Sequence, residues 1–364
     1  MALVPRHIKN LLPYKAGRPI EDLRRELGLK YIIKLASNEN PNGVSPMAIE
    51  ALKNSLKDNF RYPDPSAYLL KNKLADHFNV KEANIVVGSG SEGVMSNIMR
   101  TFLRQGDEII AAKNSFIGFK VLANASGNHI NWVPLNGYHH DLPHIAEKIN
   151  DYTKIIYLAN PDNPTGTYFT KNEFDIFMTK VPERVLVLLD EAYFEYAVQV
   201  KDYPDSMHYR YDNVITLRTF SKAHGLAGFR VGYGFAHEEL ISNLNKVKLP
   251  FEPSWPAQVC ALAAIDDQVY IDKTISSCLI EKERLYNVLN DIEIDYIKSI
   301  TNFITIILDS DQSAENFCNT MLKEGIILRH LNGWGLSSCV RVTIGTREEN
   351  EYFINNLLEY KIKK

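Results

Sequence analysis

Lys222 stands among residues that suit a reactive amine beside a bound anion. It follows a predicted strand in the stretch TFSKAHGLAGFRVGY (219–233), and the hydroxyls of Thr219 and Ser221 lie next to it in sequence. Later in the same stretch, Arg230 offers a planar guanidinium that suits bidentate contact with a phosphate. A lysine amine can bond covalently to a carbonyl carbon or act as a base. Lys222 alone would be interpreted as a surface lysine, but the neighbouring hydroxyls and arginine predict amine chemistry next to a phosphate.

Two polar residues upstream are also placed at the ends of predicted strands. The segment LANPDNPTG (158–166) runs from a strand into a Pro/Asn/Gly loop that contains Asn163, and VLVLLDEAYF (185–194) ends a strand at Asp190. Functional groups of open α/β sheets gather at the carboxyl edge of the strands. An aspartate at such a place would more often cap a helix. We interpret Asp190 as a site residue because the Lys222 motif is also present.

The segment IVVGSGSEGV (85–94) has the G-x-G-x-x-G spacing of a dinucleotide-binding turn. Dinucleotide sites also need an Asp or Glu about twenty residues further on, to hold the ribose. Here the next strand ends in AAKNSF (111–116), which contains no acid. A helix that begins at this turn still offers backbone N–H groups and positive potential to a phosphate. The turn therefore predicts a phosphate site around Ser91 and Glu92 and disfavours a nicotinamide nucleotide.

These residues can meet only at the edge of a sheet. Several predicted strands are continuously apolar, as expected for strands that are covered on both faces. The predicted strands are 85–87, 108–112, 129–135, 154–160, 185–192, 214–219 and 230–236. Helical patterns alternate with them, which favours a doubly wound α/β fold with helices on both faces of a mostly parallel sheet.

The pattern changes from about residue 256 onward. A long helical region is followed by strands at 302–308, 325–331 and 339–345 and by a final helix, which is typical of a smaller α+β domain. We therefore expect an N-terminal arm over 1–35 that packs on the small domain or on a partner, a large α/β domain over 36–255 that carries the site, and a small C-terminal domain over 256–364.

Composition excludes several classes of protein. The 364 residues include 41 Lys+Arg and 44 Asp+Glu without a charged block, which argues against a nucleic-acid or membrane-surface partner. The four cysteines form no C-x-x-C pair and the ten histidines show no metal-ligand spacing, so no metal is expected. The start, MALVPRHIKNLLPYK, is broken by Pro and Arg and is neither a signal peptide nor a membrane span. We expect a cytoplasmic protein.

Taken together, these motifs resemble the pyridoxal-phosphate (PLP) enzymes of the aspartate aminotransferase fold, fold type I, and within them the class-II aminotransferases. The glycine–serine turn, N-P-x-N-P-T-G, D-E-A-Y, S-K and R-x-G occur in the family's order along essentially the whole chain. Further segments resemble the histidinol-phosphate aminotransferase group of that family: PYKAGRPIEDLRRELGL (13–29), KLASNENPNG (34–43), RYPD (61–64) and VRVTIGT (340–346).

The resemblance implies PLP as cofactor and a mostly parallel seven-stranded sheet. It implies the transfer of an amino group from L-histidinol phosphate to 2-oxoglutarate in histidine biosynthesis. The products would be 3-(imidazol-4-yl)-2-oxopropyl phosphate and L-glutamate. It also implies a homodimer with shared active sites.

The resemblance further assigns roles to single residues. Lys222 would form the Schiff base with PLP and move a proton at the substrate, Asp190 would keep the pyridine nitrogen protonated, and Tyr193 would hydrogen-bond the phenolic oxygen. Catalytic roles are thus expected for Lys222, Asp190 and Tyr193. The expected cofactor contacts are Gly90, Ser91, Glu92, Phe116, Asn163, Asp190, Tyr193, Thr219, Ser221, Lys222, Arg230 and Tyr62 of the partner subunit.

Arg341, on the apolar strand 339–345, is the expected anion-binding residue for the substrates. An arginine on such a strand is costly unless it pairs with an anion. That anion would be the phosphate of histidinol phosphate or the α-carboxylate of glutamate and 2-oxoglutarate. Arg329, Asn40 and Tyr14 are further candidates for the substrate pocket by position.

Other functions stay open at this point. The same motifs are compatible with an aromatic amino-acid aminotransferase, because a sequence says little about the range of substrates that an enzyme accepts. A PLP-dependent lyase, such as an amino-acid phosphate decarboxylase, would share Lys222, Asp190 and Arg230. A PLP-binding sensor without catalysis would be expected to lack the lysine or the aspartate, and both are present.

Overall fold

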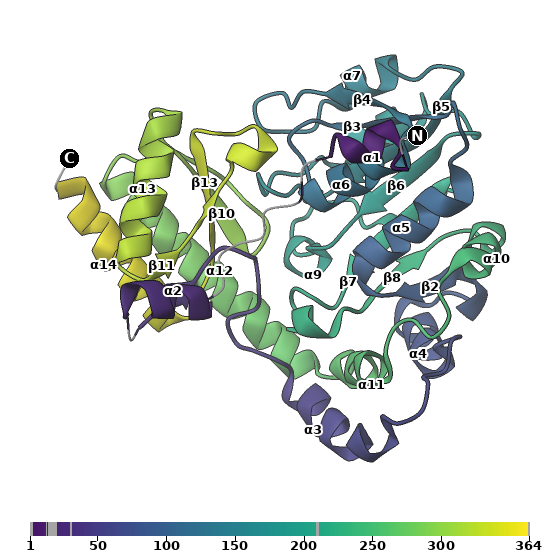
Figure 1. Ribbon diagram of the computed structural model, residues 1–364, viewed down its shortest axis with the longest axis horizontal. Helices are drawn as coiled ribbons and strands as arrows, with labels where there is room; N and C mark the ends of the chain where they lie inside the picture. Colours follow the sequence, from purple (N-terminus) through teal and green to yellow (C-terminus); the bar gives the residue numbers. More distant parts are fainter. Residues whose placement is uncertain (1–2, 12, 14–19, 30, 209–210, 363–364) are drawn as a thin grey trace.

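The computed structural model describes residues 3–11, 13, 20–29, 31–208 and 211–362. Figure 1 shows a larger unit built on a central sheet and a smaller C-terminal unit beside it. The long helix α12 (Gln268–Asp291) runs from beside α11 (Trp255–Ala264) into the smaller unit (Figure 1).

The central sheet has seven strands in the order β2-β8-β7-β6-β5-β3-β4. Only β8 runs antiparallel to its neighbours, so the predicted mostly parallel sheet is confirmed. The strands are β2 (Ile85–Gly88), β3 (Glu108–Ala112), β4 (His129–Val133), β5 (Thr153–Ala159), β6 (Leu186–Asp190), β7 (Val214–Thr219) and β8 (Gly232–Phe235). The parallel strands β5, β6 and β7 therefore end at one edge, which the chain leaves near Asn163, Asp190 and Lys222.

Helices cover both faces of this sheet, which explains the continuously apolar strands. Alternate residues such as Ile155 and Leu188 pack with α5, α6 and α10, whereas Ile156 and Val187 pack with α7 and α8 on the other face. The helices of this unit are α3 (Pro46–Ser55), α4 (Tyr68–Phe78), α5 (Gly90–Phe102), α6 (Ile117–Ser126), α7 (Leu142–Glu147), α8 (Lys171–Met178), α9 (Phe194–Ala197), α10 (Glu238–Val247) and α11.

The smaller unit is an antiparallel sheet of order β12-β13-β10-β9 packed against three helices. Its elements are β9 (Tyr296–Ile297), β10 (Phe303–Ile307), α13 (Asp311–Lys323), β11 (Ile326–Ile327), β12 (Arg329–His330), β13 (Cys339–Thr343) and α14 (Arg347–Ile362). The strand predicted over 325–331 is two short strands in different sheets. The chain turns between them because β11 pairs with the early strand β1 (Ile33–Lys34), while β12 pairs with β13.

The N-terminal segments contact both units. The short helix α1 (Arg6–Lys9) lies against α6, and α2 (Ile20–Leu27) packs through Leu23 on Ala36 and Ile327 (Figure 1). No helix among the described residues carries an apolar stretch long enough to cross a bilayer.

Candidate active site

A cavity of about 540 Å³ opens at the carboxyl ends of β5, β6 and β7. This place suits a small-molecule site of an open α/β sheet. Its lining comes from separate stretches of the chain: Ser91, Glu92, Phe116, Ala159, Pro161, Asn163, Asp190, Ala192, Tyr193, Thr219, Ser221, Lys222 and Arg230. The fold thus brings together most of the residues that the sequence proposed as cofactor contacts.

The mouth of α5 keeps space for a ligand because two glycines stand there. Gly90 has φ of 77°, and a Cβ on it would come within 2.9 Å of Nη2 of Arg230. A Cβ on Gly232 would come within 2.4 Å of the backbone nitrogen of Ser91. Any side chain at either position would therefore disturb the start of α5 or the arginine above it.

Donors that suit an anion converge on that mouth. Nη1 of Arg230 lies 3.4 Å from Oγ of Ser221, and Nη2 lies 3.2 Å from Oε2 of Glu92. The hydroxyls of Thr219 and Ser221 are bonded at 3.0 Å. Arg230 itself has φ of 55°, the left-handed region that non-glycine residues seldom adopt. With the first N–H groups of α5, the guanidinium of Arg230 and the two hydroxyls form a cup of donors that suits a phosphate.

Asp190 lies at the floor of the cavity with only 4% of its surface exposed. Its Oδ2 accepts a hydrogen bond of 2.8 Å from the hydroxyl of Tyr157, and its Oδ1 accepts one of 3.2 Å from the backbone N–H of Ala192. Burial raises the pKa of Asp190 to about 7 against the opposing effect of these bonds. A carboxylate in this setting suits a cationic partner such as a protonated ring nitrogen.

Lys222 projects into the same cavity beside Tyr193. Its Nζ lies 3.5 Å from the carbonyl oxygen of Ser37 and 5.5 Å from the centroid of the Tyr193 ring. Burial lowers the pKa of Lys222 to about 8, and the nearby Arg341 acts in the same direction. A lysine with a lowered pKa is more often the neutral amine that can act as nucleophile or base.

Tyr193 and Asn163 complete the polar wall. The hydroxyl of Tyr193 accepts a hydrogen bond of 2.7 Å from Nδ2 of Asn38, and burial raises the pKa of Tyr193 to about 12. Oδ1 of Asn163 accepts a hydrogen bond from Nη1 of Arg341. Tyr193 therefore stays a protonated donor at neutral pH, and Asn163 links the cavity to the smaller unit.

Two arginines of the smaller unit stand side by side; neither lines the cavity, but one of them, Arg341, bonds the lining residue Asn163. Arg329 and Arg341 are direct cross-strand partners on β12 and β13, so their side chains share one face of the sheet. Nη2 of Arg341 lies 2.8 Å and Nε of Arg329 lies 3.4 Å from the carbonyl oxygen of Ala36. Like charges directly opposite one another destabilise a sheet, and an anion bound between them would relieve that repulsion.

Of the remaining predicted residues, Asn40 and Tyr62 do not line the cavity of their own chain, and Tyr14 is not described. Asn40 does not line the cavity, because its Nδ2 bonds the carbonyl oxygen of Ala223 at 2.8 Å and braces the chain next to Lys222. Tyr62 is 80% exposed and stacks on Phe251, with ring centroids 4.3 Å apart. Tyr14 lies outside the described residues.

Sequence reasoning missed two residues of the site. Tyr157 lies within an apolar strand, where an aromatic side chain reads as core, and only the strand register places its hydroxyl beside Asp190. Asn38 comes from the segment 34–43 that the resemblance included, but its contact with Tyr193 joins residues far apart in sequence. The spacing of residues along the sequence predicts neither contact.

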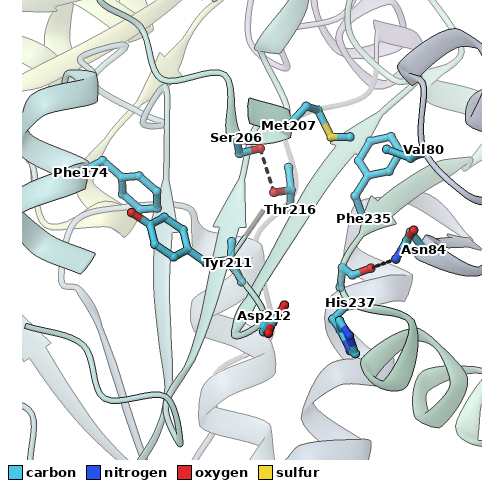
Figure 2. A pocket seen from close by; sticks show the side chains of 12 residues that line it. Val80, Asn84, Phe174, Ser206, Met207, Tyr211, Asp212, Thr216, Phe235 and His237 are labelled. Carbon is cyan, nitrogen blue, oxygen red and sulfur yellow. Dashed lines mark hydrogen bonds between the residues drawn. The ribbon is translucent and has the colours of Figure 1, made fainter. Parts of the chain in front are cut away.

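A second and larger cavity, of about 740 Å³, lies at the opposite edge of the sheet near the start of β7. Figure 2 shows two hydrogen bonds among its lining residues. Oγ1 of Thr216 donates to Oγ of Ser206 at 2.8 Å, and Nδ2 of Asn84 donates to the backbone oxygen of Ala236 at 2.9 Å. It has neither a lysine nor an arginine among its lining residues. The chemistry of the sequence motifs therefore belongs to the first cavity.

Comparisons with known proteins point to one family. Residues 30–357 match the family profile described as aminotransferase class I and II. Histidinol-phosphate aminotransferase 2 of Carboxydothermus hydrogenoformans is 40% identical over 357 residues, which cover 98% of each chain. The histidinol-phosphate aminotransferase of Moorella thermoacetica is 41% identical over 97% of this chain and 91% of its own.

Solved structures give the same result for the fold. The histidinol-phosphate aminotransferase from Sinorhizobium meliloti, crystallised in complex with pyridoxal-5'-phosphate, superposes with a TM-score of 0.92. It is 27% identical, and the match covers 100% of this chain and 98% of that one. An aspartate aminotransferase of Thermus thermophilus, 19% identical over 98% of this chain, shares the fold with a TM-score of 0.82.

Proposed function

The chain belongs to the class I and II aminotransferase family, and we propose that it is a PLP-dependent histidinol-phosphate aminotransferase of histidine biosynthesis. It transfers the amino group of L-histidinol phosphate to 2-oxoglutarate. The products are 3-(imidazol-4-yl)-2-oxopropyl phosphate and L-glutamate. The observation that supports this choice of substrate is the cross-strand pair of arginines, Arg329 and Arg341.

The cavity fits PLP in both charge and shape. The cup at the start of α5, with Ser221 and Arg230, would hold the phosphate, and Phe116 would lie against the ring. Asp190 would face the ring nitrogen, while Asn163 and Tyr193 would face the phenolic oxygen. When bound, PLP supplies an aldehyde for amines and a ring that accepts the electrons of the bond broken at the substrate carbon.

Each side chain then has a definite task. Nζ of Lys222 would hold the cofactor through its aldehyde and, once freed by the incoming amine, would carry the proton from the substrate Cα to the cofactor carbon. Asp190 would favour a protonated ring nitrogen by placing a carboxylate beside it. Tyr193, with its raised pKa, donates from its hydroxyl. Phe116 and the buried walls exclude water from the reacting atoms.

The paired arginines distinguish this substrate from an amino acid. A phosphate monoester carries nearly two negative charges and three acceptor oxygens, which suits two guanidinium groups. A carboxylate carries a single charge and can satisfy one guanidinium in bidentate fashion. The pair therefore favours a phosphate-bearing donor while still accepting glutamate.

Changing Arg329 to Gln is expected to lower kcat/KM for histidinol phosphate by about 10- to 100-fold, because one charge-assisted hydrogen bond to the phosphate is lost. The loss for glutamate should be smaller, since Arg341 can hold a carboxylate alone. Steady-state kinetics with both donors checks this. Equal losses for the two donors would contradict the assignment of Arg329 to the phosphate.

An aromatic amino-acid aminotransferase remains the second candidate. The wild-type enzyme is measured with histidinol phosphate, phenylalanine and tyrosine as donors. A higher kcat/KM for the aromatic acids would overturn our first choice. Incubating the PLP form with donor alone distinguishes a lyase from an aminotransferase. Transamination leaves stoichiometric pyridoxamine phosphate, whereas decarboxylation releases CO2 and retains the aldehyde.

We further propose a cytoplasmic homodimer in which Tyr62 of the partner subunit completes the phosphate cup. Tyr62 is 80% exposed on its own chain, where it stacks on Phe251. An exposed aromatic pair of this kind is available to a partner subunit. Other large apolar side chains are exposed in the same stretches of sequence: Met47, Ile49, Leu56, Phe60, Tyr68, Leu69 and Leu249.

Hybrid dimers test this arrangement. Lys222→Ala and Tyr62→Phe chains with different affinity tags are mixed, refolded or co-expressed, and the hybrid is isolated. In the hybrid, one site pairs a wild-type Lys222 with a wild-type Tyr62, so we expect about half of the wild-type activity and wild-type PLP affinity at that site. Tyr68→Phe, which changes another exposed tyrosine, replaces Tyr62→Phe in the control. A monomer in solution, or a hybrid no better than the Tyr62→Phe dimer, would contradict the proposal.

We also propose that the chain divides into an arm over 1–35, a large domain over 36–255 and a small domain over 256–364. The pairing of β1 with β11 supports an arm that packs on the small domain.

A further inference from the structure

Tyr157 and Asp190 form a buried pair beneath the cavity. They lie on the adjacent parallel strands β5 and β6, and Tyr157 is 1% and Asp190 is 4% exposed. The Tyr157 hydroxyl donates to Oδ2 of Asp190 at 2.8 Å. Both side chains are almost wholly buried, so this bond takes the place of most solvent contacts at one carboxylate oxygen.

The ring of Tyr157 is held in place by its neighbour. It stacks on Phe119 of α6 with centroids 3.8 Å apart and planes inclined by only 7°. The stack fixes the direction in which the hydroxyl points. Burial raises the pKa of Tyr157 well above its usual value, so the hydroxyl keeps its proton and remains a donor.

We propose that Tyr157 is a positioning residue that acts through Asp190, orienting its carboxylate toward the ring nitrogen of the bound cofactor and stabilising its ionised form. This inference rests on the proposed function and deepens it. Oδ1 of Asp190 already accepts from the backbone of Ala192. Tyr157 holds Oδ2, and the two donors together leave the carboxylate a single orientation in the floor of the cavity.

The charges around Asp190 make the tyrosine important. Glu92 at the start of α5 raises the pKa of Asp190, while Lys222 beyond β7 lowers it. Beside these, the titratable groups nearest the pair are Tyr193, Asp162 and Tyr157 itself. Removing the hydroxyl removes a bond that favours the charged form, so the pKa of Asp190 rises above its present value of about 7. The ionised form predominates above that pKa. As the pH falls, the variant should therefore lose activity at a higher pH than the wild type does.

The test compares Tyr157→Phe with Tyr168→Phe. Tyr168 donates to Oδ1 of Asp202 at the same 2.8 Å, but at the surface and outside the cavity. Tyr157→Phe keeps the ring and its stack and loses one oxygen atom. We expect it to weaken PLP binding to the apoenzyme about tenfold and to move the acid limb of the kcat/KM profile up by about one pH unit. Tyr168→Phe should change neither.

A double-mutant cycle on PLP affinity separates a role through Asp190 from a purely structural one. In an Asp190→Asn background, Tyr157→Phe should have little further effect, because the carboxylate it supports is gone. Wild-type PLP affinity and an unmoved acid limb in Tyr157→Phe would overturn the inference, as would full additivity of the two changes. If the wild-type chain itself binds no PLP, the proposed function fails instead.

Discussion

Replacing Lys222 by alanine is expected to lower kcat/KM for histidinol phosphate by on the order of 10⁴-fold, the upper range for loss of a positioned general base. The expectation is this large because one amine serves both as the covalent link to PLP and as the base at the substrate Cα. Burial and Arg341 lower the pKa of Lys222 to about 8, which makes the neutral amine accessible near physiological pH.

Two variants sharpen this experiment. Lys222→Arg keeps the positive charge but offers no neutral amine, so it should lose as much activity as Lys222→Ala. Lys246→Ala removes an exposed lysine of α10 and should behave as wild type. A small primary amine added to Lys222→Ala should restore part of the rate, because the shortened side chain leaves room in the cavity. Activity of Lys222→Arg near that of wild type would show that charge, rather than amine chemistry, is the role of this residue.

Changing Asp190 to Asn is expected to lower kcat by about 10²- to 10³-fold, the usual cost of removing one electrostatic group from a preorganised site. The shape of the side chain is kept, but a neutral amide no longer favours a protonated ring nitrogen. The KM for histidinol phosphate should change little, since the proposed phosphate-binding residues Arg329 and Arg341 are unchanged. Rate measurements at saturating substrate and PLP separate the two constants.

The pH dependence provides an internal check on this variant. The pKa of Asp190 is raised to about 7 by burial, and the carboxylate form that supports the reaction exists above it. Wild-type activity should therefore fall as pH drops through this range, and the limb due to Asp190 should vanish in Asp190→Asn. Asp212→Asn, at the rim of the second cavity, is the matched control. A wild-type rate in Asp190→Asn would rule out a role for this carboxylate at the ring nitrogen.

Much of the fold follows from local patterns in the sequence. The runs IVV (85–87) and VLVLL (185–189) are apolar throughout because helices cover both faces of the sheet, so the sequence itself indicates their burial. The order of the motifs also predicts that Asn163, Asp190 and Lys222 meet, because parallel strands end at one edge.

Contacts that depend on packing across the molecule cannot be predicted from local sequence patterns. The bond from Tyr157 to Asp190 requires the register of two strands, and the bond from Asn38 to Tyr193 requires the N-terminal segment to lie over the site. Asn40 reads as a substrate residue in sequence, yet its amide is bonded to the backbone of Ala223. The division of 325–331 into two strands depends on the distant partner β1.

The most direct test of the account is to identify the residue that carries the cofactor. The protein is reconstituted with PLP, reduced with borohydride to make the link permanent, digested and analysed by mass spectrometry. We expect an equimolar cofactor adduct on the peptide that contains Lys222, and no adduct there in Lys222→Ala. An adduct on another lysine such as Lys248, or no adduct on any peptide, would contradict the central claim.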